Sequence, residues 1–340
     1  LQKSIDQTIE ILKIPEGYKV GIVAGSDTGA IEMAMWNLLG SKPVEILAWE
    51  VFGNDWKKDI LEQLKINDSN THVADFGDIP DLSKINFDND VIFTWNGTTS
   101  GVKVPNADWI PLDRKGLVLC DATSAVFAQD VEWKKLDVVT FSWQKVLGGE
   151  AAHGIIVLSP KAIEHLESYT PKWPIPKIFR LTKSNKVIEG IFKGETLNTP
   201  SMLCVEDYLD ALSWVKGIGG LNACFGRAND SFNLINDWVD RSDVIDFLCQ
   251  EKINRSNTSV CLKFCDDRVV SQNDETQRAL AKEIGVLLEK EGVAYDIVNH
   301  RSAPPGLRIW TGATVESTDV KALLPWIDWA YNQAFNKILN

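Results

Sequence analysis

The stretch DVVTFSWQKVLGG, residues 137–149, decides the fold class. Residues 138–143 are mostly apolar or β-branched, as in a buried strand, and a lysine and a glycine-rich turn follow them. A buried ammonium group loses much of its hydration energy unless it is paired or deprotonated. Lys145 therefore predicts a functional amine at the end of a buried strand, although a surface lysine with a buried stem would show the same pattern.

Similar apolar runs alternate with helical patterns throughout the first 160 residues. This alternation predicts an α/β fold with a mixed, mostly parallel sheet and helices on both faces. The runs, besides the one before Lys145, are YKVGIVAG, VEILAWE, THVADF, NDVIFTWN, GLVLCDA and HGIIVLS. A segment rich in Pro, Lys and Gly at residues 160–200 predicts an extended excursion over the surface.

The rest of the chain predicts a smaller α+β domain, so that the chain divides into a large domain, 1–210, and a small C-terminal domain, 211–340. We expect two helices directly after residue 204 and two more near 275–291 and 318–338. Three runs, SVCLKF, AYDIVNH and LRIWTG, are predicted to be its strands.

Composition narrows the classes of partner. The 340 residues carry a net charge of -12, which would repel a nucleic-acid backbone or an anionic membrane, so small molecules are the expected ligands. The six cysteines include no CxxC pair, which argues against a metal site and for reduced thiols in the cytoplasm. No signal peptide or long apolar stretch occurs, and no initiator Met precedes the helical pattern LQKSIDQTIEIL, so we expect part of the N-terminus to be missing.

Two further features complement Lys145. Asp121 follows the apolar run GLVLC just as Lys145 follows its own run, so both belong at strand ends. A desolvated lysine can form a Schiff base with a carbonyl, and a buried Asp complements the ring nitrogen of pyridoxal phosphate. Ser26, Asp27 and Thr28 begin a predicted helix whose N-terminus could hold the cofactor phosphate. The simpler alternatives are a helix N-cap at Asp121 and a capping cluster at residues 26–28.

Six segments in order resemble the phosphoserine aminotransferase family, which belongs to the class V pyridoxal-phosphate enzymes with the aspartate-aminotransferase-type fold (fold type I). The likeness extends from about residue 20 to the C-terminus. The segments are GIVAGSDTGAIEMAMWNLLG, TWNGTTSGV, LVLCDATSA, FSWQKVLGG, ETLNTPSML and NHRSAPPGLRIWTGA. The resemblance implies pyridoxal 5'-phosphate as the cofactor.

The resemblance also implies roles for single residues around the cofactor. Lys145 matches the lysine that binds the cofactor aldehyde, and Asp121 matches the carboxylate beside the ring nitrogen. Thr98, or its neighbour Thr99, resembles the threonine near the phenolic oxygen. Gln144 matches a side chain near the cofactor phosphate.

The phosphate cradle and the ring-stacking residue follow from the same resemblance. Ser26, Asp27 and Thr28 lie where the family surrounds the phosphate with a helix N-terminus. Because Asp27 replaces a small residue that is more usual there, we expect its backbone N–H group, and not its carboxylate, to face the anion. Trp56 in VFGNDW resembles the aromatic residue stacked on the ring, with ordinary core packing as the alternative.

Substrate-binding and subunit-crossing residues are likewise implied. Arg308 matches the arginine that binds the substrate α-carboxylate, and His300 and Arg301 match a pair that binds a substrate phosphate. Asn198 and Thr199 resemble residues that reach the cofactor phosphate of the neighbouring subunit, which implies a homodimer. A surface ion pair, a structural histidine and a simple Asn-Thr-Pro turn are the respective alternatives.

The implied reaction transfers an amino group from L-glutamate to 3-phosphohydroxypyruvate, giving 2-oxoglutarate and O-phospho-L-serine for serine biosynthesis. Family members begin with about 30 further residues that carry another His-Arg pair, and this sequence lacks them. One alternative is another class V enzyme, such as an alanine–glyoxylate aminotransferase. A second is a nucleotide-binding α/β protein, which the absence of GxGxxG after the first strand disfavours.

Overall fold

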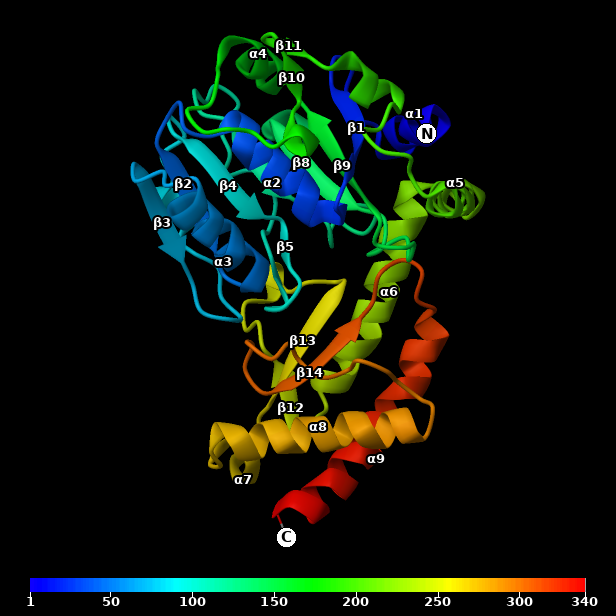
Figure 1. Cartoon of the computed structure of the whole chain (residues 1–340). Coiled ribbons are helices and arrows are strands. Elements are labelled where there is room, and N and C mark those ends of the chain that lie inside the picture. The colour runs from blue at the N-terminus through cyan, green and yellow to red at the C-terminus, as the bar shows by residue number, and fades with distance from the viewer. Residues whose placement is uncertain (340) are drawn as a thin grey trace.

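The computed structural model describes residues 1–339, and it contains a larger part and a smaller part, each built on its own sheet (Figure 1). The larger part holds a seven-stranded sheet, and the smaller part holds a three-stranded sheet near the C-terminus. The predicted domain boundary after residue 210 falls inside helix α5 (Met202–Gly217) and stays a prediction.

All seven predicted apolar runs of the first half form the large sheet. Its strand order is β1-β9-β8-β7-β4-β2-β3. The five strands from β8 to β3 are parallel, and β9 is antiparallel to both of its neighbours, as a mixed and mostly parallel sheet requires. The bounds are β1 (Lys19–Ala24), β2 (Val44–Ala48), β3 (Ser69–Val73), β4 (Asp90–Thr94), β7 (Val118–Asp121), β8 (Val138–Ser142) and β9 (His153–Leu158).

Helices cover both faces of this sheet, so its central strands are buried on both sides. Neighbouring residues of β4 show the alternation, since Ile92 enters one hydrophobic core and Phe93 enters the other. The Ile92 core is covered by α2 (Ser26–Leu38), α3 (Val51–Lys58) and α4 (Pro160–Ser168). The Phe93 core is covered by α1 (Gln2–Leu12) and α5.

The smaller part has an antiparallel sheet in the order β12-β13-β14 and three long helices. One predicted strand was wrong, because AYDIVNH contributes only an isolated bridge at Val298, and Asp296 within it has a left-handed φ of 50° that interrupts an extended run. The bounds are β12 (Ile245–Phe247), β13 (Ser259–Phe264), β14 (Gly306–Trp310), α6 (Leu221–Val239), α7 (Asp267–Val270), α8 (Asp274–Lys290) and α9 (Ser317–Leu339).

Short elements complete the chain. Two small hairpins pair β5 with β6 and β10 with β11. Their bounds are β5 (Asn96–Gly97), β6 (Val102–Lys103), β10 (Thr182–Lys183) and β11 (Lys186–Val187). A π-helical turn at Asp59–Gln63 extends α3, and 3-10 turns lie at Leu82–Lys84, Trp133–Lys135, Lys177–Phe179, Glu189–Lys193 and Lys252–Asn254.

Residues 256–259, just before and at the start of β13, join the two parts by hydrogen bonds. The Ser259 hydroxyl donates to the Thr98 carbonyl at 2.5 Å, and the Thr258 hydroxyl donates to the Ser124 carbonyl at 2.8 Å. The Ser256 N–H group donates to a carbonyl of the 97–101 turn at 2.9 Å. The start of β13 is therefore anchored to the loops that follow β4 and β7 of the large sheet.

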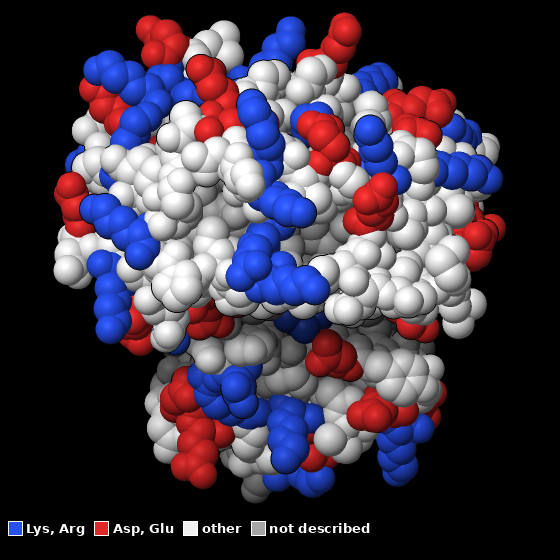
Figure 2. Space-filling view, turned by 45° about the horizontal axis from the view of Figure 1, so that its top comes forward, with Lys and Arg blue, Asp and Glu red and all other residues white. Residues whose placement is uncertain are grey.

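The surface carries both signs of charge. On the face in Figure 2, basic and acidic side chains are interspersed with uncharged surface, and a band of Lys and Arg side chains crosses the middle. None of the helices within residues 1–339 has the length and apolar character needed to cross a membrane.

Candidate active site

A cavity of about 120 Å³ lies where the parallel strands of the large sheet end and the following helices begin. This edge is where open α/β sheets bind ligands. All but two of its lining residues are polar or charged, which indicates a site for a polar ligand. The lining consists of Ser26, Asp27, Thr28, Glu50, Phe52, Trp56, Thr94, Asn96, Thr98, Asp121, Thr123, Ser124, Gln144 and Lys145.

The cavity brings Lys145 and Asp121 together, as their positions after neighbouring strands predict. Burial lowers the pKa of the Lys145 amine, and the Arg308 guanidinium lowers it further. The carboxylates of Asp121, Glu50 and Asp27 act in the opposite direction and raise it. A lysine with a lowered pKa holds more of its amine uncharged near neutral pH, which is the form needed for nucleophilic or proton-transfer chemistry.

Two donors fix the orientation of the Asp121 carboxylate. The Thr123 backbone N–H group donates to Oδ1 at 3.0 Å, and the Trp56 indole donates to Oδ2 at 3.3 Å. Trp56 is only 4% exposed. Its predicted stacking role stays a prediction, and Phe52, which is 36% exposed, is a second aromatic candidate for the same wall.

The start of α2 forms a strained turn beside Gln144. Gly25 is the N-cap with a φ of 84°, and Ser26 has a φ of 56°, so residues 26–28 are not the capping cluster considered as the simpler alternative. Gly29 allows the sharp turn, because a Cβ there would lie 2.0 Å from the Ala24 carbonyl oxygen. Gln144 Nε2 donates to Ser26 Oγ at 2.7 Å. The N-terminus of α2 therefore lies beside the Ser26 hydroxyl and the Gln144 amide. Free backbone N–H groups together with such polar side chains are suited to binding an anion.

The side chain of Asp27 faces the interior. It is 6% exposed, and burial, together with the neighbouring Asp121 carboxylate, raises its pKa well above the ordinary value. That the Asp27 backbone, and not its side chain, faces an anion stays a prediction.

The structure separates the two adjacent threonines. Thr98 lines the cavity, and its hydroxyl donates to Ser124 Oγ at 2.9 Å. Thr99 is directed elsewhere, because its hydroxyl donates to Glu50 Oε2 at 2.9 Å and accepts from the Val51 N–H group. Thr98 is therefore the one of the pair that can reach a ligand in the cavity.

Glu50 is a functional candidate that the sequence analysis missed. It is fully buried, accepts from the Gly53 N–H group at 2.7 Å and caps α3. Burial raises the pKa of Glu50 to about 7, although hydrogen bonds from Gly53 and Thr99 oppose the shift. The available signal was its position directly after the run VEILAW, the same pattern that identifies Asp121 and Lys145.

Arg308, His300 and Arg301 do not line the cavity, and Arg308 lies near enough to act on Lys145. Arg308 is on β14, forms an ion pair with Asp296 at 3.2 Å, and its charge influences Lys145. Burial lowers the pKa of His300, and the charges of Arg308 and Arg301 lower it further. Arg301 is exposed. The three predicted substrate-binding residues thus form one basic group on the side of the small part.

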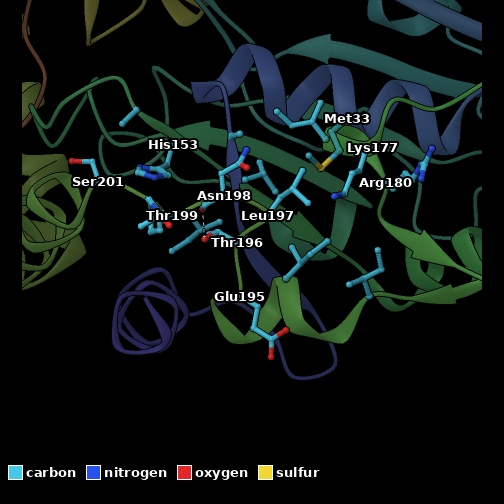
Figure 3. Close-up of a pocket in the computed structure, with 18 of the residues that line it drawn as sticks. Met33, His153, Lys177, Arg180, Glu195, Thr196, Leu197, Asn198, Thr199 and Ser201 are labelled. Carbon is cyan, nitrogen blue, oxygen red and sulfur yellow. Dashed lines mark hydrogen bonds between the residues drawn. The ribbon is translucent and has the colours of Figure 1, made fainter.

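Asn198 and Thr199 lie in a different cavity, of about 630 Å³, and not with Lys145. In Figure 3 Asn198 lies between His153 and Met33 and Thr199 lies below His153, both on the segment that precedes α5. Both residues are exposed. Their own chain's Lys145 cavity therefore does not use them.

Residues 1–339 contain no group of three His, Cys, Asp or Glu side chains that could hold a metal ion. All six cysteines, which lie in the same range, are free thiols.

Comparisons with known proteins identify the family. The chain is 54% identical over 332 residues to phosphoserine aminotransferase of Methanosarcina barkeri, covering 98% of this chain and 87% of that one. It is 52% identical to the same enzyme of Methanosarcina mazei over the same shares. No protein-family model matches the chain.

Solved structures agree with the fold. A phosphoserine aminotransferase from Cytophaga hutchinsonii matches with a TM-score of 0.79 at 20% identity and covers 100% of this chain and 88% of that one. The enzyme from Bacillus circulans matches with a TM-score of 0.77 at 19% identity, over 97% and 85% of the two chains. The aminotransferase fold expected from the resemblance is confirmed, and the chain belongs to the phosphoserine aminotransferase family.

Proposed function

We propose that this chain is a pyridoxal-phosphate-dependent transaminase that converts L-glutamate and 3-phosphohydroxypyruvate to 2-oxoglutarate and O-phospho-L-serine, a step of serine biosynthesis. The names of its close relatives support this reaction. The observation that carries the proposal is the shared cavity of Lys145, whose pKa is lowered, and Asp121. Catalytic roles for single residues are part of the proposal.

The residues of the cavity fit the cofactor. Gln144 Oε1 and Asp27 Oδ1 are buried and have no hydrogen-bond partner, as expected where a polar ligand completes the contacts. When bound, pyridoxal phosphate supplies an electron sink for the charge that develops at the substrate α-carbon. Lys145 would hold its aldehyde, Asp121 would face its ring nitrogen, and the start of α2 would bind its phosphate.

The chain itself supplies positioning and proton transfer. The Lys145 amine would act as the base that removes the proton from the substrate α-carbon, which its lowered pKa favours. Arg308 binds the α-carboxylate with its planar guanidinium and so orients the Cα–H bond toward that amine. Arg301 would add positive charge where the phosphate of the substrate would lie, and His300, whose pKa is lowered, would donate a hydrogen bond there as a neutral imidazole.

The double substitution His300→Asn with Arg301→Gln tests the phosphate site. We expect KM for O-phospho-L-serine to rise about tenfold to a hundredfold, because charge-assisted hydrogen bonds to the phosphate are lost. Turnover of L-glutamate, which has no phosphate, should stay within about twofold of wild type. Steady-state assays on both amino donors, with L-alanine as a third, measure the difference. An equal loss on all three would favour the alternative of another class V aminotransferase.

A homodimer with composite sites is the second part of the proposal. The exposed side chains Ile178 and Leu197 line the 630 Å³ cavity, and the exposed Met202 and Leu203 follow its lining residue Ser201 in the chain. Such a group of exposed apolar side chains is typical of a protein–protein contact. Asn198 and Thr199 lie on the same surface. We expect a second copy of the chain to cover this surface and to receive both residues at its own phosphate site.

Subunit mixing tests the composite site. A Lys145→Ala chain and an Asn198→Ala, Thr199→Ala chain are each expected to be nearly inactive as homodimers. Random exchange of equal amounts makes half of the dimers mixed, and each mixed dimer holds one intact site, so about one quarter of wild-type activity should return. Activity that stays at the sum of the two parents after exchange, verified by mass-tagged subunits, would rule the composite site out.

A cytoplasmic location is also part of the proposal. Five of the six free thiols are buried, and such cysteines are typical of proteins in a reducing compartment.

A further inference from the structure

Glu50 is fully buried in the wall of the 120 Å³ cavity, and the proposed chemistry gives it no role. It lies between β2 and α3, and its side chain caps the helix. Helix N-caps prefer Ser, Thr, Asn and Asp, whose shorter side chains reach the first N–H groups of the helix. The longer side chain of Glu50 therefore indicates a second task besides the cap.

The two carboxyl oxygens of Glu50 join two separate segments of the chain. Oε1 accepts a hydrogen bond from the Gly53 N–H group at 2.7 Å, at the start of α3. Oε2 accepts from the Thr99 hydroxyl at 2.9 Å, in the turn between β5 and β6. The same hydroxyl accepts from the Val51 N–H group at 3.1 Å, so the two segments are linked twice. Because both oxygens have partners, the carboxyl group is suited to positioning other residues and not to contacting a ligand.

On the helix side, these hydrogen bonds bracket Phe52, which lines the cavity. Val51, the residue before it, donates its N–H group to the Thr99 hydroxyl. Gly53, the residue after it, donates its N–H group to Glu50 Oε1. The backbone is therefore fixed on both sides of Phe52.

On the hairpin side, the contacts of Glu50 bracket Thr98, which also lines the cavity. Thr99, the residue after it, donates to Glu50 Oε2. Gly97, the residue before it, packs against the stem of Glu50, since a Cβ at Gly97 would lie 2.7 Å from Glu50 Cγ. The Thr98 hydroxyl itself donates to Ser124 Oγ at 2.9 Å. Glu50 thus fixes the backbone around Thr98, and Ser124 fixes its hydroxyl.

We propose that Glu50 is a positioning residue whose carboxyl group holds Phe52 and Thr98 in the cavity wall by joining the start of α3 to the β5–β6 turn. The inference rests on the proposed function for the ligand of this cavity, pyridoxal phosphate. When the two segments are joined beforehand, binding of the cofactor does not have to order them, which increases affinity. Burial raises the pKa of Glu50 to about 7, and a buried acid of this kind is typical of residues that serve a site.

Three substitutions separate the link from the helix cap. Glu50→Gln keeps an oxygen for the Gly53 N–H group and places an amide beside the Thr99 hydroxyl, so both contacts survive. Glu50→Asp can still cap α3, but its side chain is one methylene shorter and cannot also reach Thr99. Thr99→Val removes the hydroxyl at nearly the same shape, and Thr99 does not line the cavity. An effect of Thr99→Val on the cavity must therefore act through Glu50 and Val51.

Amide hydrogen exchange of the cofactor-free protein tests the link itself. Peptides covering residues 51–56 and 96–102 should exchange about tenfold faster in Thr99→Val and in Glu50→Ala than in wild type, and at the wild-type rate in Glu50→Gln. Asn273→Ala is the control, because Asn273 caps α8 away from the cavity and its loss should speed exchange at α8 alone. If Glu50→Ala fails to fold, Thr99→Val still decides. Exchange at the wild-type rate in both peptides of Thr99→Val overturns the proposal.

Cofactor affinity tests the positioning role. The dissociation constant of pyridoxal phosphate should stay within about threefold of wild type in Glu50→Gln and rise about tenfold in Glu50→Asp and in Thr99→Val. Asn273→Ala, which weakens only a distant cap, should stay within about twofold. Wild-type affinity in Glu50→Asp would mean that the helix cap alone matters, against the proposal. If the wild type binds no pyridoxal phosphate, the proposed function fails, while hydrogen exchange still decides whether Glu50 joins the two segments.

Discussion

Replacing Lys145 with alanine is expected to lower kcat for transamination by about 10⁴-fold, the largest effect of any single substitution in the chain. The variant loses both the amine that holds the cofactor and the base that moves the α-proton. Cofactor absorbance in the visible range should change at the same time, and borohydride treatment should no longer attach the cofactor to the chain. Both are measured on purified protein after incubation with pyridoxal phosphate.

Lys103→Ala is the matched control for this prediction. Lys103 lies on β6, and burial lowers its pKa too, but it does not line the cavity. Its removal should leave kcat within about twofold of wild type. If Lys145→Ala and Lys103→Ala have similar effects, the loss comes from structure and not from chemistry, and the catalytic assignment of Lys145 is wrong.

Glu50→Gln is expected to make stability less dependent on pH. A folded-state pKa of about 7, against 4.5 for an ordinary Glu, means that the folded protein prefers the protonated acid. The ionised group therefore opposes folding, by about 3 kcal/mol once the pH exceeds 7. As the pH rises from 5 to 8, this cost should appear in the wild type and be absent from the variant.

Urea unfolding of the cofactor-free protein at both pH values measures this difference. The free energy of unfolding of Glu50→Gln, relative to wild type, should increase by about 2 kcal/mol between pH 5 and pH 8, because part of the cost is already present at pH 5. Asp266→Asn is the control, because hydrogen bonds from Arg268 and Tyr331 lower the pKa of Asp266 to about 2, and its contribution is lost only as the pH falls below the ordinary range of an Asp. A constant difference for Glu50→Gln at the two pH values would contradict the assigned burial of its charge.

The sequence predicted most of the large part and less of the small part for a physical reason. The buried strands of a large sheet need apolar runs, and all seven runs became strands, five of them parallel. In the small part, β12 has only three residues and gives no periodicity to detect. The wrongly predicted strand, AYDIVNH, has an apolar pattern, but the left-handed Asp296 within it depends on the tertiary structure.

The candidate site likewise contains some residues that the sequence predicted and others that it did not. Lys145 and Asp121 were predictable because a charged residue directly after an apolar run has few structural reasons to be there. Thr98 and Thr99 have the same side chain, and only the turn between β5 and β6 decides which one reaches the cavity. Phe52 was missed because the first turn of α3 can present several residues, and the sequence does not fix its rotation.

The hydrogen bonds of residues 256–259 have a consequence for substrate choice. They tie the start of β13 to the loops around Thr98 and Ser124, and β14 pairs with β13 in register, with Cys261 opposite Arg308. These hydrogen bonds and the strand pairing thus hold Arg308 at a fixed distance from Lys145. If Arg308 binds the substrate carboxylate as proposed, this fixed distance selects amino acids by the length between that carboxylate and the group at the other end.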